Sequence, residues 1–268
     1  MATRLGVHAD RLAGVRALRS GKGRREQGRF ALEGATLLEE ATASGFPVSE
    51  IYATEPAYEA TPIVRELDAS GIPTYLIEGT SAARISDLTT PSGIVAVGPM
   101  RLASSERVFG AGWPVLVLAD LNDPANAGAL LRSADAFGCR GVVFGSRGVD
   151  PYHPKVVRGS MGAIFRLSIG VAEPAEVAAA AVTAGFRLLG LAVGGSELSE
   201  EAWESPAALV VGNERQGLGR WEALCSRLLA IPMVGRSESL SAAVAGSIAL
   251  YEAGRSRPRR LATKEQSA

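Results

Sequence analysis

Short apolar runs that end in polar loops divide the last third of the chain. Residues 208–212 and 228–232 are predicted to be two β-strands, because each is almost wholly apolar and ends at glycine or proline. Polar loops follow both runs, and small residues after Leu240 predict a closely packed helix. Loops at strand ends beside the start of a helix are where open α/β sheets bind ligands. We therefore expect a binding site within residues 207–251.

The alternation of apolar runs with helical periodicity begins at residue 115. Four more strands are predicted at 115–120, 141–145, 167–171 and 188–193. Helices are predicted at 127–137, 151–166 and 174–184. The pair Gly194-Gly195 is predicted to be a turn. Strands that alternate with helices at this spacing predict an α/β domain with a mostly parallel sheet of about six strands.

A smaller α/β unit is predicted before this domain. Its strands are expected at 30–34, 50–54, 74–78 and 94–98, and its helices at 35–45, 57–70 and 80–88. Residues 99–114 show no periodicity and contain glycine, serine and proline, which is typical of a linker. The predicted layout is a small domain over residues 1–98, a linker over 99–114 and a larger domain over 115–268.

The N-terminal segment is strongly basic. Residues 1–29 carry eight basic and two acidic side chains, whereas residues 30–100 carry two basic and ten acidic ones. Residues 8–20 predict an amphipathic helix, and 21–25 predict a flexible basic loop. Dense arginine beside glycine suits contacts with a polyanion, although a solvated arm that aids solubility is the alternative. The candidate phosphate contacts are Arg19, Lys22, Arg24 and Arg25.

Composition excludes several classes of protein. The chain has 268 residues, which suits about two domains, and 47% of them are apolar, which is enough for a sizeable core. Its two cysteines, Cys139 and Cys225, give neither a disulfide framework nor metal-ligand spacing. There is no apolar signal core and no run long enough to cross a bilayer. We expect a cytoplasmic protein without metal or membrane partners.

The nucleotide-binding fingerprints are missing from the sequence. It contains no GxxxxGK[ST] motif and no GxGxxG that follows the first strand of the larger domain. A polar loop does occur at residues 121–128, where Asp123-Pro124 favours a turn and Asn126 stands at a helix start. Arg132 follows six residues later and can point back toward a ligand crevice at the strand ends. A helix cap and a surface arginine are the alternative interpretation.

Three segments, in order, carry a resemblance to a known family. NDPANAGALLR, VVGNERQGLG and IPMVGRSESLSAAVA resemble the signature motifs of the SpoU-type (TrmH-like) RNA ribose 2′-O-methyltransferases of the SPOUT class. The resemblance covers residues 115–253 strongly and 14–98 more weakly. It implies a C-terminal SPOUT domain with a deep trefoil knot and a parallel sheet. It also implies a small N-terminal α/β ribosomal-protein-like RNA-binding domain, S-adenosylmethionine as cofactor, and a homodimer with the C-terminal helix in its interface.

The resemblance also assigns expected roles to single residues. It implies cofactor contacts, largely through backbone groups, for Gly212, Ile231 and Leu240. Arg132 is similar to the family's catalytic arginine. Polar motif residues expected at the catalytic site are Asn126, Glu214, Ser239 and Ser241. Arg158 resembles an arginine that some members use for RNA. Ser241 is a departure, because the family usually has asparagine there.

The expected activity is methyl transfer from S-adenosylmethionine to a ribose 2′-hydroxyl of structured RNA. The substrate expected first is large-subunit (23S) rRNA, and some similar enzymes confer antibiotic resistance in this way. One alternative is a tRNA 2′-O-methyltransferase. A non-catalytic RNA-binding or ribosome-assembly protein with the same fold is another, and a nucleotide-dependent metabolic enzyme on a plain α/β fold is the third.

Overall fold

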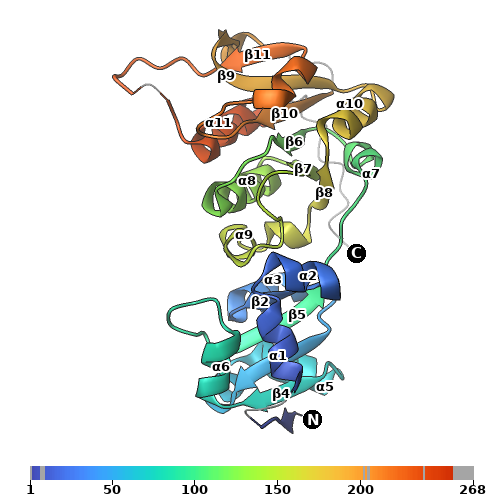
Figure 1. Cartoon of the computed structure of the whole chain (residues 1–268), viewed down its shortest axis with the longest axis vertical. Coiled ribbons are helices and arrows are strands. Elements are labelled where there is room, and N and C mark those ends of the chain that lie inside the picture. The colour runs from blue at the N-terminus through green and yellow to red at the C-terminus, as the bar shows by residue number, and fades with distance from the viewer. Residues whose placement is uncertain (1, 7–9, 202, 204–205, 238, 256–268) are drawn as a thin grey trace. The chain divides into compact units, whose positions relative to one another are not determined.

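A computed structural model describes residues 2–6, 10–201, 203, 206–237 and 239–255 of the chain (Figure 1). The chain forms two compact units. Unit 1 comprises Met1–Leu102, Asn122–Arg132 and Val149–Ile169. Unit 2 comprises Ala103–Leu121, Ser133–Gly148 and Gly170–Ala268. This division is interleaved along the sequence, whereas the sequence analysis expects one linker at 99–114.

Unit 1 contains a five-stranded sheet in the order β1-β4-β3-β5-β2. Its strands are β1 (Thr3–Arg4), β2 (Arg29–Glu33), β3 (Glu50–Thr54), β4 (Thr74–Ile77) and β5 (Ile94–Pro99). Strand β4 pairs in parallel with β1 and β3, and β5 pairs antiparallel with β2 and β3. The four predicted strands are confirmed, and β1 has only two residues, too few to give a periodic signal.

The helices of unit 1 follow the predicted pattern with two interruptions. They include α3 (Ala35–Ala43), α4 (Glu55–Ala60), α5 (Pro62–Ala69), α6 (Gly79–Ile85) and α9 (Pro154–Gly159). The helix predicted over 151–166 is reduced to α9 and the 3₁₀ turn η1 (Ala163–Phe165), because Met161 and Gly162 between them have positive φ angles. The helix predicted over 57–70 is divided at Thr61, which has extended backbone angles. The ring of Pro62 disfavours a helical conformation for the residue before it, so two shorter helices replace the one.

The basic N-terminal segment is more ordered than its composition suggests. It forms α1 (Asp10–Ala17) and α2 (Gly21–Gln27), so the loop predicted over 21–25 is wrong. The hydroxyl of Ser20 caps α2 by accepting a hydrogen bond of 3.0 Å from the backbone N–H of Gly23. Apolar residues of this segment, Leu12, Val15 and Leu18, are buried in a core cluster with residues of the sheet.

The order of this segment corrects the prediction that Arg24 contacts phosphate. Its side chain is 2% exposed, and its Nη2 and Nε atoms donate to Oδ2 of Asp150 at 2.7 and 3.0 Å. Nη1 donates to the carbonyl of Leu18 at 2.9 Å. A guanidinium held in this way stabilises the fold of unit 1 and is not presented to a solvent-borne phosphate. We therefore remove Arg24 from the candidate RNA contacts.

Unit 2 is organised by a six-stranded sheet in the order β11-β9-β10-β6-β7-β8. Its strands are β6 (Val115–Leu118), β7 (Gly141–Gly145), β8 (Ser168–Ala172), β9 (Arg187–Glu197), β10 (Ala207–Val211) and β11 (Arg227–Ala230). The pairings β11–β9, β9–β10, β10–β6 and β6–β7 are parallel. The predicted α/β class and parallel sheet are confirmed, whereas the threading of the chain that makes a knot stays a prediction.

Helices complete unit 2 around this sheet. They include α7 (Ser105–Gly110), the end of α8 (Pro124–Ala136), α10 (Pro174–Thr183) and α11 (Ala242–Arg255), with short 3₁₀ turns η2 (Leu198–Glu200) and η3 (Gly219–Leu224). Helix α7 lies within the predicted linker, so residues 99–114 are not irregular throughout. The core packs valines of the central strands, such as Val117 and Val210, against Trp221 of η3.

Strand β9 differs from its prediction at Gly194-Gly195. The expected turn is absent, and the strand continues to Glu197. Leu228 of β11 pairs with Gly190, but the next residue, Leu229, pairs with Ser196. Residues 191–195 are therefore an insertion in the ladder between β9 and β11.

Candidate active site

A cavity of about 370 Å³ lies at the carboxyl ends of β10 and β11, beside the start of α11. Four segments of unit 2 form its wall. They comprise residues 191–194, 211–214 with 217, 229–231 with 233, and 239–242 with 245. The position agrees with the expectation that ligands bind beyond the carboxyl ends of parallel strands.

Six of the residues predicted from the sequence come together in this cavity. They are Gly212, Glu214, Ile231, Ser239, Leu240 and Ser241. They come from the second and third motifs, which are separated by the η3 turn and β11. The fold therefore unites the two motifs in one cavity, as expected for a site they share.

Sequence reasoning missed the wall that β9 contributes. Residues 191–194 line the cavity because the insertion in the β9–β11 ladder removes them from regular pairing. Gly194 adopts a φ of +83°, a left-handed conformation that glycine allows at little steric cost. The Gly-Gly pair was a usable signal, since glycine inside a strand often marks a bulge. Asn213 and Met233 are two further lining residues that the sequence analysis did not single out.

Gly212 occupies a position with no room for a side chain. A Cβ atom there would lie 2.7 Å from the backbone nitrogen of Leu218 and would overlap the carbonyl of Gly217. The loop is closed on itself, because Asn213 N–H donates to the Gly217 carbonyl at 2.9 Å and Gly217 N–H donates back to the Asn213 carbonyl at 2.8 Å. The backbone of Gly212 therefore faces the cavity from a fixed loop.

The third motif supplies the cap of α11. The hydroxyl of Ser241 accepts a hydrogen bond of 3.3 Å from Val244 N–H, and its carbonyl accepts one of 2.9 Å from Ala245 N–H. Ser241 is thus the N-cap of the helix, a position that asparagine also favours. Its neighbour Leu240 is 37% exposed, so an apolar side chain stands at the cavity without being covered by the protein.

The first-motif residues lie on α8, in the part of this helix that belongs to unit 1. Asp123 precedes the helix and accepts a hydrogen bond of 2.9 Å from Ala125 N–H, which is a capping contact. Asn126 is half-buried in the first turn, and Arg132 is exposed. Their roles in catalysis stay predictions.

The end of α8 that belongs to unit 2 packs on α11. The hydroxyl oxygens of Ser133 and Ser247 are 2.7 Å apart. The rings of Phe137 and Tyr251 make an edge contact with centroids 5.7 Å apart. The residue after Arg132 is therefore held against the helix whose first turn lines the cavity.

The candidate RNA-binding basic residues of unit 1 fall into two groups. Arg19 and Arg158 line one small hollow, so two predicted residues lie close together. Arg158 donates to Asp87 Oδ2 at 3.1 Å, and its side chain is 27% exposed. Lys22 and Arg25 are exposed on α2. In the described part of the chain there is no group of three or more histidine, cysteine, aspartate or glutamate side chains that could hold a metal ion, and no helix long and apolar enough to cross a membrane.

Two family models match the chain. The SpoU rRNA Methylase family model matches residues 114–251, and the MRM3-like substrate binding domain model matches residues 10–96. The 23S rRNA (guanosine(2553)-2′-O)-methyltransferase RlmP of Bacillus subtilis (strain 168) is 30% identical over 238 residues, which are 87% of this chain and 92% of that protein. The 23S rRNA (uridine(2479)-2′-O)-methyltransferase of Streptomyces viridochromogenes is 36% identical over 176 residues, 62% of this chain and 61% of that protein.

Solved structures resemble the whole fold. The SpoU methyltransferase AviRb from Streptomyces viridochromogenes, in complex with S-adenosylmethionine, gives a TM-score of 0.84 at 28% identity and covers 93% of this chain and 98% of that one. The S-adenosylmethionine-bound rRNA methyltransferase from Sinorhizobium meliloti gives a TM-score of 0.84 at 26% identity. The match covers 95% of this chain and 98% of that one. All the residues that line the cavity lie within residues 114–251, the segment that the SpoU rRNA Methylase family model matches. The chain belongs to the SpoU rRNA methylase family of S-adenosylmethionine-dependent RNA 2′-O-methyltransferases.

Proposed function

We propose that this protein methylates a ribose 2′-hydroxyl of 23S rRNA and that the cavity at Gly212 and Leu240 holds the S-adenosylmethionine. The observation that carries this proposal is the convergence of the second and third motifs on one cavity. Relatives that match most of this chain or share its motif region are named as 23S rRNA 2′-O-methyltransferases. An enzyme with this substrate would work in the cytoplasm, where ribosomes are assembled.

The residues of the cavity fit the cofactor. Ile231 and Leu240 provide apolar walls for an adenine ring, and the backbone near Gly212 offers hydrogen-bonding groups without a side chain in the way. The bound cofactor supplies an electrophilic methyl group on a positively charged sulfur. A Cβ atom at Gly212 would overlap Gly217 of the same loop, so glycine at this position keeps the loop closed beside the cavity.

Arg132 is proposed to act on the ribose hydroxyl. A guanidinium is a poor general base, because it stays protonated at any working pH. It is well suited to stabilise negative charge that develops on the 2′-oxygen and to hold an adjacent phosphate. Asn126, Glu214 and Ser239 are proposed to shape the surroundings of this arginine. The hydroxyl, oriented in line with the methyl group, would form the new O–C bond as the S–C bond breaks, with S-adenosylhomocysteine as the leaving group and the hydroxyl proton passing to solvent.

The RNA is proposed to bind unit 1 through exposed basic side chains. Arg19 and Arg158 lie at one hollow, while Lys22 and Arg25 project from α2. Such contacts are sequence-independent, so they would position the RNA and give binding a steep salt dependence. Competition between rRNA and tRNA transcripts in the methylation assay will show which of the two the enzyme prefers.

A homodimer that uses α11 is proposed from the surface of this helix. Val244, Ile248 and Tyr251 are 47%, 38% and 52% exposed. Their spacing puts three apolar side chains on one face of the helix. Light scattering over a dilution series should give the mass of a dimer, and a monomer at all concentrations would contradict this part of the proposal.

The test of the function is the variant Arg132→Ala. We expect loss of methyl transfer to rRNA, measured as incorporation of labelled methyl groups followed by mapping of the 2′-O-methylated nucleotide. Calorimetry should show cofactor binding within about twofold of wild type, because Arg132 lies outside the cavity lining. A variant that retains substantial activity would contradict the role of Arg132, and a wild-type protein without cofactor binding would contradict the proposed function.

A further inference from the structure

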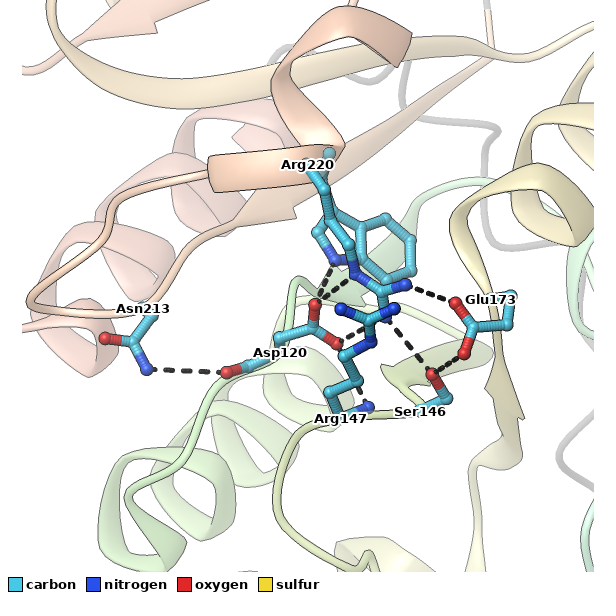
Figure 2. A network of polar contacts seen from close by, with 7 residues as sticks. Asp120, Ser146, Arg147, Glu173, Asn213 and Arg220 are labelled. Atoms are coloured by element: carbon cyan, nitrogen blue, oxygen red, sulfur yellow. Dashed lines mark hydrogen bonds and ion pairs between the residues drawn. The ribbon is translucent and has the colours of Figure 1, made fainter.

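Asp120 stands at an unusual place in the backbone of unit 2. It lies two residues after β6 and has a φ of +50°, which is uncommon for a residue with a side chain. Conformations of this kind are kept only where the surrounding structure holds them in place. Figure 2 shows that Asp120 is at the centre of a polar network whose members come from several strand ends.

The backbone of Asp120 contacts the start of the cofactor loop. We use this name for residues 212–221, which run from the end of β10 into η3. The side-chain N–H of Asn213 donates to the carbonyl of Asp120 at 3.4 Å. Asn213 also lines the cavity and makes both of the backbone hydrogen bonds that close the loop on Gly217.

The carboxylate of Asp120 contacts the end of the same loop. Arg220 donates to it in a two-pronged geometry, with Nε to Oδ2 at 2.7 Å and Nη2 to Oδ1 at 3.1 Å. The indole N–H of Trp221 donates to Oδ2 at 2.9 Å. A single residue thus holds both ends of the segment that carries Gly212, Glu214 and Gly217 to the cavity.

Each carboxylate oxygen of Asp120 accepts two hydrogen bonds. Oδ2 accepts from Arg220 and Trp221, and Oδ1 accepts from Arg220 and from the backbone N–H of Arg147, the last at 3.2 Å. Burial alone would raise the pKa of this carboxyl, but the hydrogen bonds from Arg220, Trp221 and Arg147 outweigh burial and lower it below its ordinary value. Asp120 is therefore charged at neutral pH.

Two glycines pack closely against the turn that carries Asp120. A Cβ atom at Gly145 would lie 2.6 Å from the backbone nitrogen of Asp120 and 2.8 Å from the Trp221 ring. A Cβ atom at Gly148 would lie 2.8 Å from the carbonyl of Leu121. These two glycines let the backbone beyond β7 pack directly on the Asp120 turn, which fixes the carboxylate.

We propose that Asp120 is a positioning residue for methyl transfer, which holds the cofactor loop in its binding conformation from both ends. The inference rests on the proposed function, because it assumes that the cavity holds S-adenosylmethionine. Asp120 does not line the cavity, so it acts through Asn213 and Arg220 and not on the ligand. It should therefore affect cofactor affinity first. Once bound, the cofactor would hold the loop and its Glu214 in the same conformation, so the chemical step should be unchanged.

The test is the variant Asp120→Asn in the full-length protein. The amide has the same size, but at either oxygen position its NH₂ group would face two N–H donors. We expect the Kd and KM for S-adenosylmethionine to rise about tenfold, as for loss of a charged hydrogen bond. The kcat at saturating cofactor should stay within about twofold. The indole N–H resonance of Trp221 should shift in the NMR spectrum, because its acceptor is lost.

Two further variants keep the test decisive. Arg220→Gln removes the two-pronged hydrogen bond to Asp120. The Arg220 side chain is 26% exposed, so the fold should tolerate this variant. The variant should also raise the KM for S-adenosylmethionine about tenfold. Glu173→Gln is the matched control. Glu173 is exposed and contacts only Nη1 of the same guanidinium, so its replacement leaves both hydrogen bonds from Arg220 to Asp120 in place, and this variant should bind cofactor within about twofold of wild type.

The outcomes separate the inference from the function on which it rests. Wild-type affinity in Asp120→Asn and Arg220→Gln would overturn the inference, while cofactor binding by the wild type would leave the proposed function intact. A fall in kcat at saturating cofactor with unchanged Kd would also overturn it, since that result marks a role in chemistry. If Asp120→Asn does not fold, the result for Arg220→Gln decides.

Discussion

The cofactor loop and the basic N-terminal segment are both polar and contain glycine. They differ in whether their polar groups face a ligand site or are bound by other groups of the protein. In the loop, glycine and backbone contacts fix the chain so that polar and apolar groups face a cavity. In the N-terminal segment, buried Arg24 and half-exposed Arg29 are bound by the acidic groups of Asp150 and Glu50. The comparison teaches that charge identifies an interface only where the fold leaves that charge exposed.

The largest expected effect on cofactor binding is at Gly212. In Gly212→Ala the new methyl group overlaps the Gly217 carbonyl, so the loop must move. Overpacking of this kind costs about 1–3 kcal/mol, which corresponds to about 5- to 150-fold weaker cofactor binding if the whole cost falls on the loop conformation that binds the cofactor. Calorimetry measures the cofactor affinity. Gly235→Ala is the matched control, because a Cβ atom there meets nothing within 4 Å. Equal cofactor affinity for both variants would contradict the account of the loop.

The second effect is on stability and compares a buried with an exposed arginine of α2. Arg24→Ala removes one partner of a buried ion pair and should lower the free energy of unfolding by about 3 kcal/mol. Arg25→Ala, at the next and exposed position, should change it by less than about 0.5 kcal/mol. Denaturant unfolding gives both values. Similar losses in the two variants would mean that burial does not distinguish these arginines.

The third effect concerns RNA affinity. The double variant of Lys22→Ala and Arg25→Ala should bind rRNA more weakly, and the slope of log K against log salt concentration should fall by about 2. This variant is preferable to deletion of residues 1–25, because deletion would remove Leu12, Val15 and Leu18 from the core. Arg65→Ala, on α5, is the control. An unchanged slope would exclude α2 from the RNA-binding surface.

The smallest effect is expected at Ser241, where this chain departs from the family pattern. Ser241→Asn should keep the cap of α11 and change stability by less than about 0.5 kcal/mol, with methyl transfer equal or faster. Ser241→Ala, which loses the cap, should cost about 1 kcal/mol. Single-turnover rates and thermal melts measure both. Complete loss of activity in the asparagine variant would show that a small side chain is required here.

Local pattern predicted the elements of this protein well where apolar runs are continuous. The fully buried strands β6, β7 and β10 are examples, because each is a short run of valine, leucine, alanine or phenylalanine, which in β7 is flanked by glycine. Pattern failed at α2, where GKGRREQ has two glycines and no apolar residue to give a periodic signal. Its charged and amide residues favour a helix, and the Ser20 cap and the burial of Arg24 add to that preference.

Only part of the candidate site could be predicted, because its remaining residues are brought together by tertiary contacts. The resemblance to the family implied that Gly212 and Leu240 share one site, and the structure places both in one cavity. Motif spacing could not reveal the wall from β9, which depends on a ladder insertion opposite β11. It could not reveal the Asp120 network either, since Asp120 and Arg220 are 100 residues apart in sequence and meet only in the folded sheet.

A crystal structure of the protein soaked with S-adenosylmethionine tests the central claim most directly. The account predicts the adenine between Ile231 and Leu240 and the cofactor against the backbone of Gly212. Density for the cofactor at another site, or an empty cavity at saturating concentration, would contradict it.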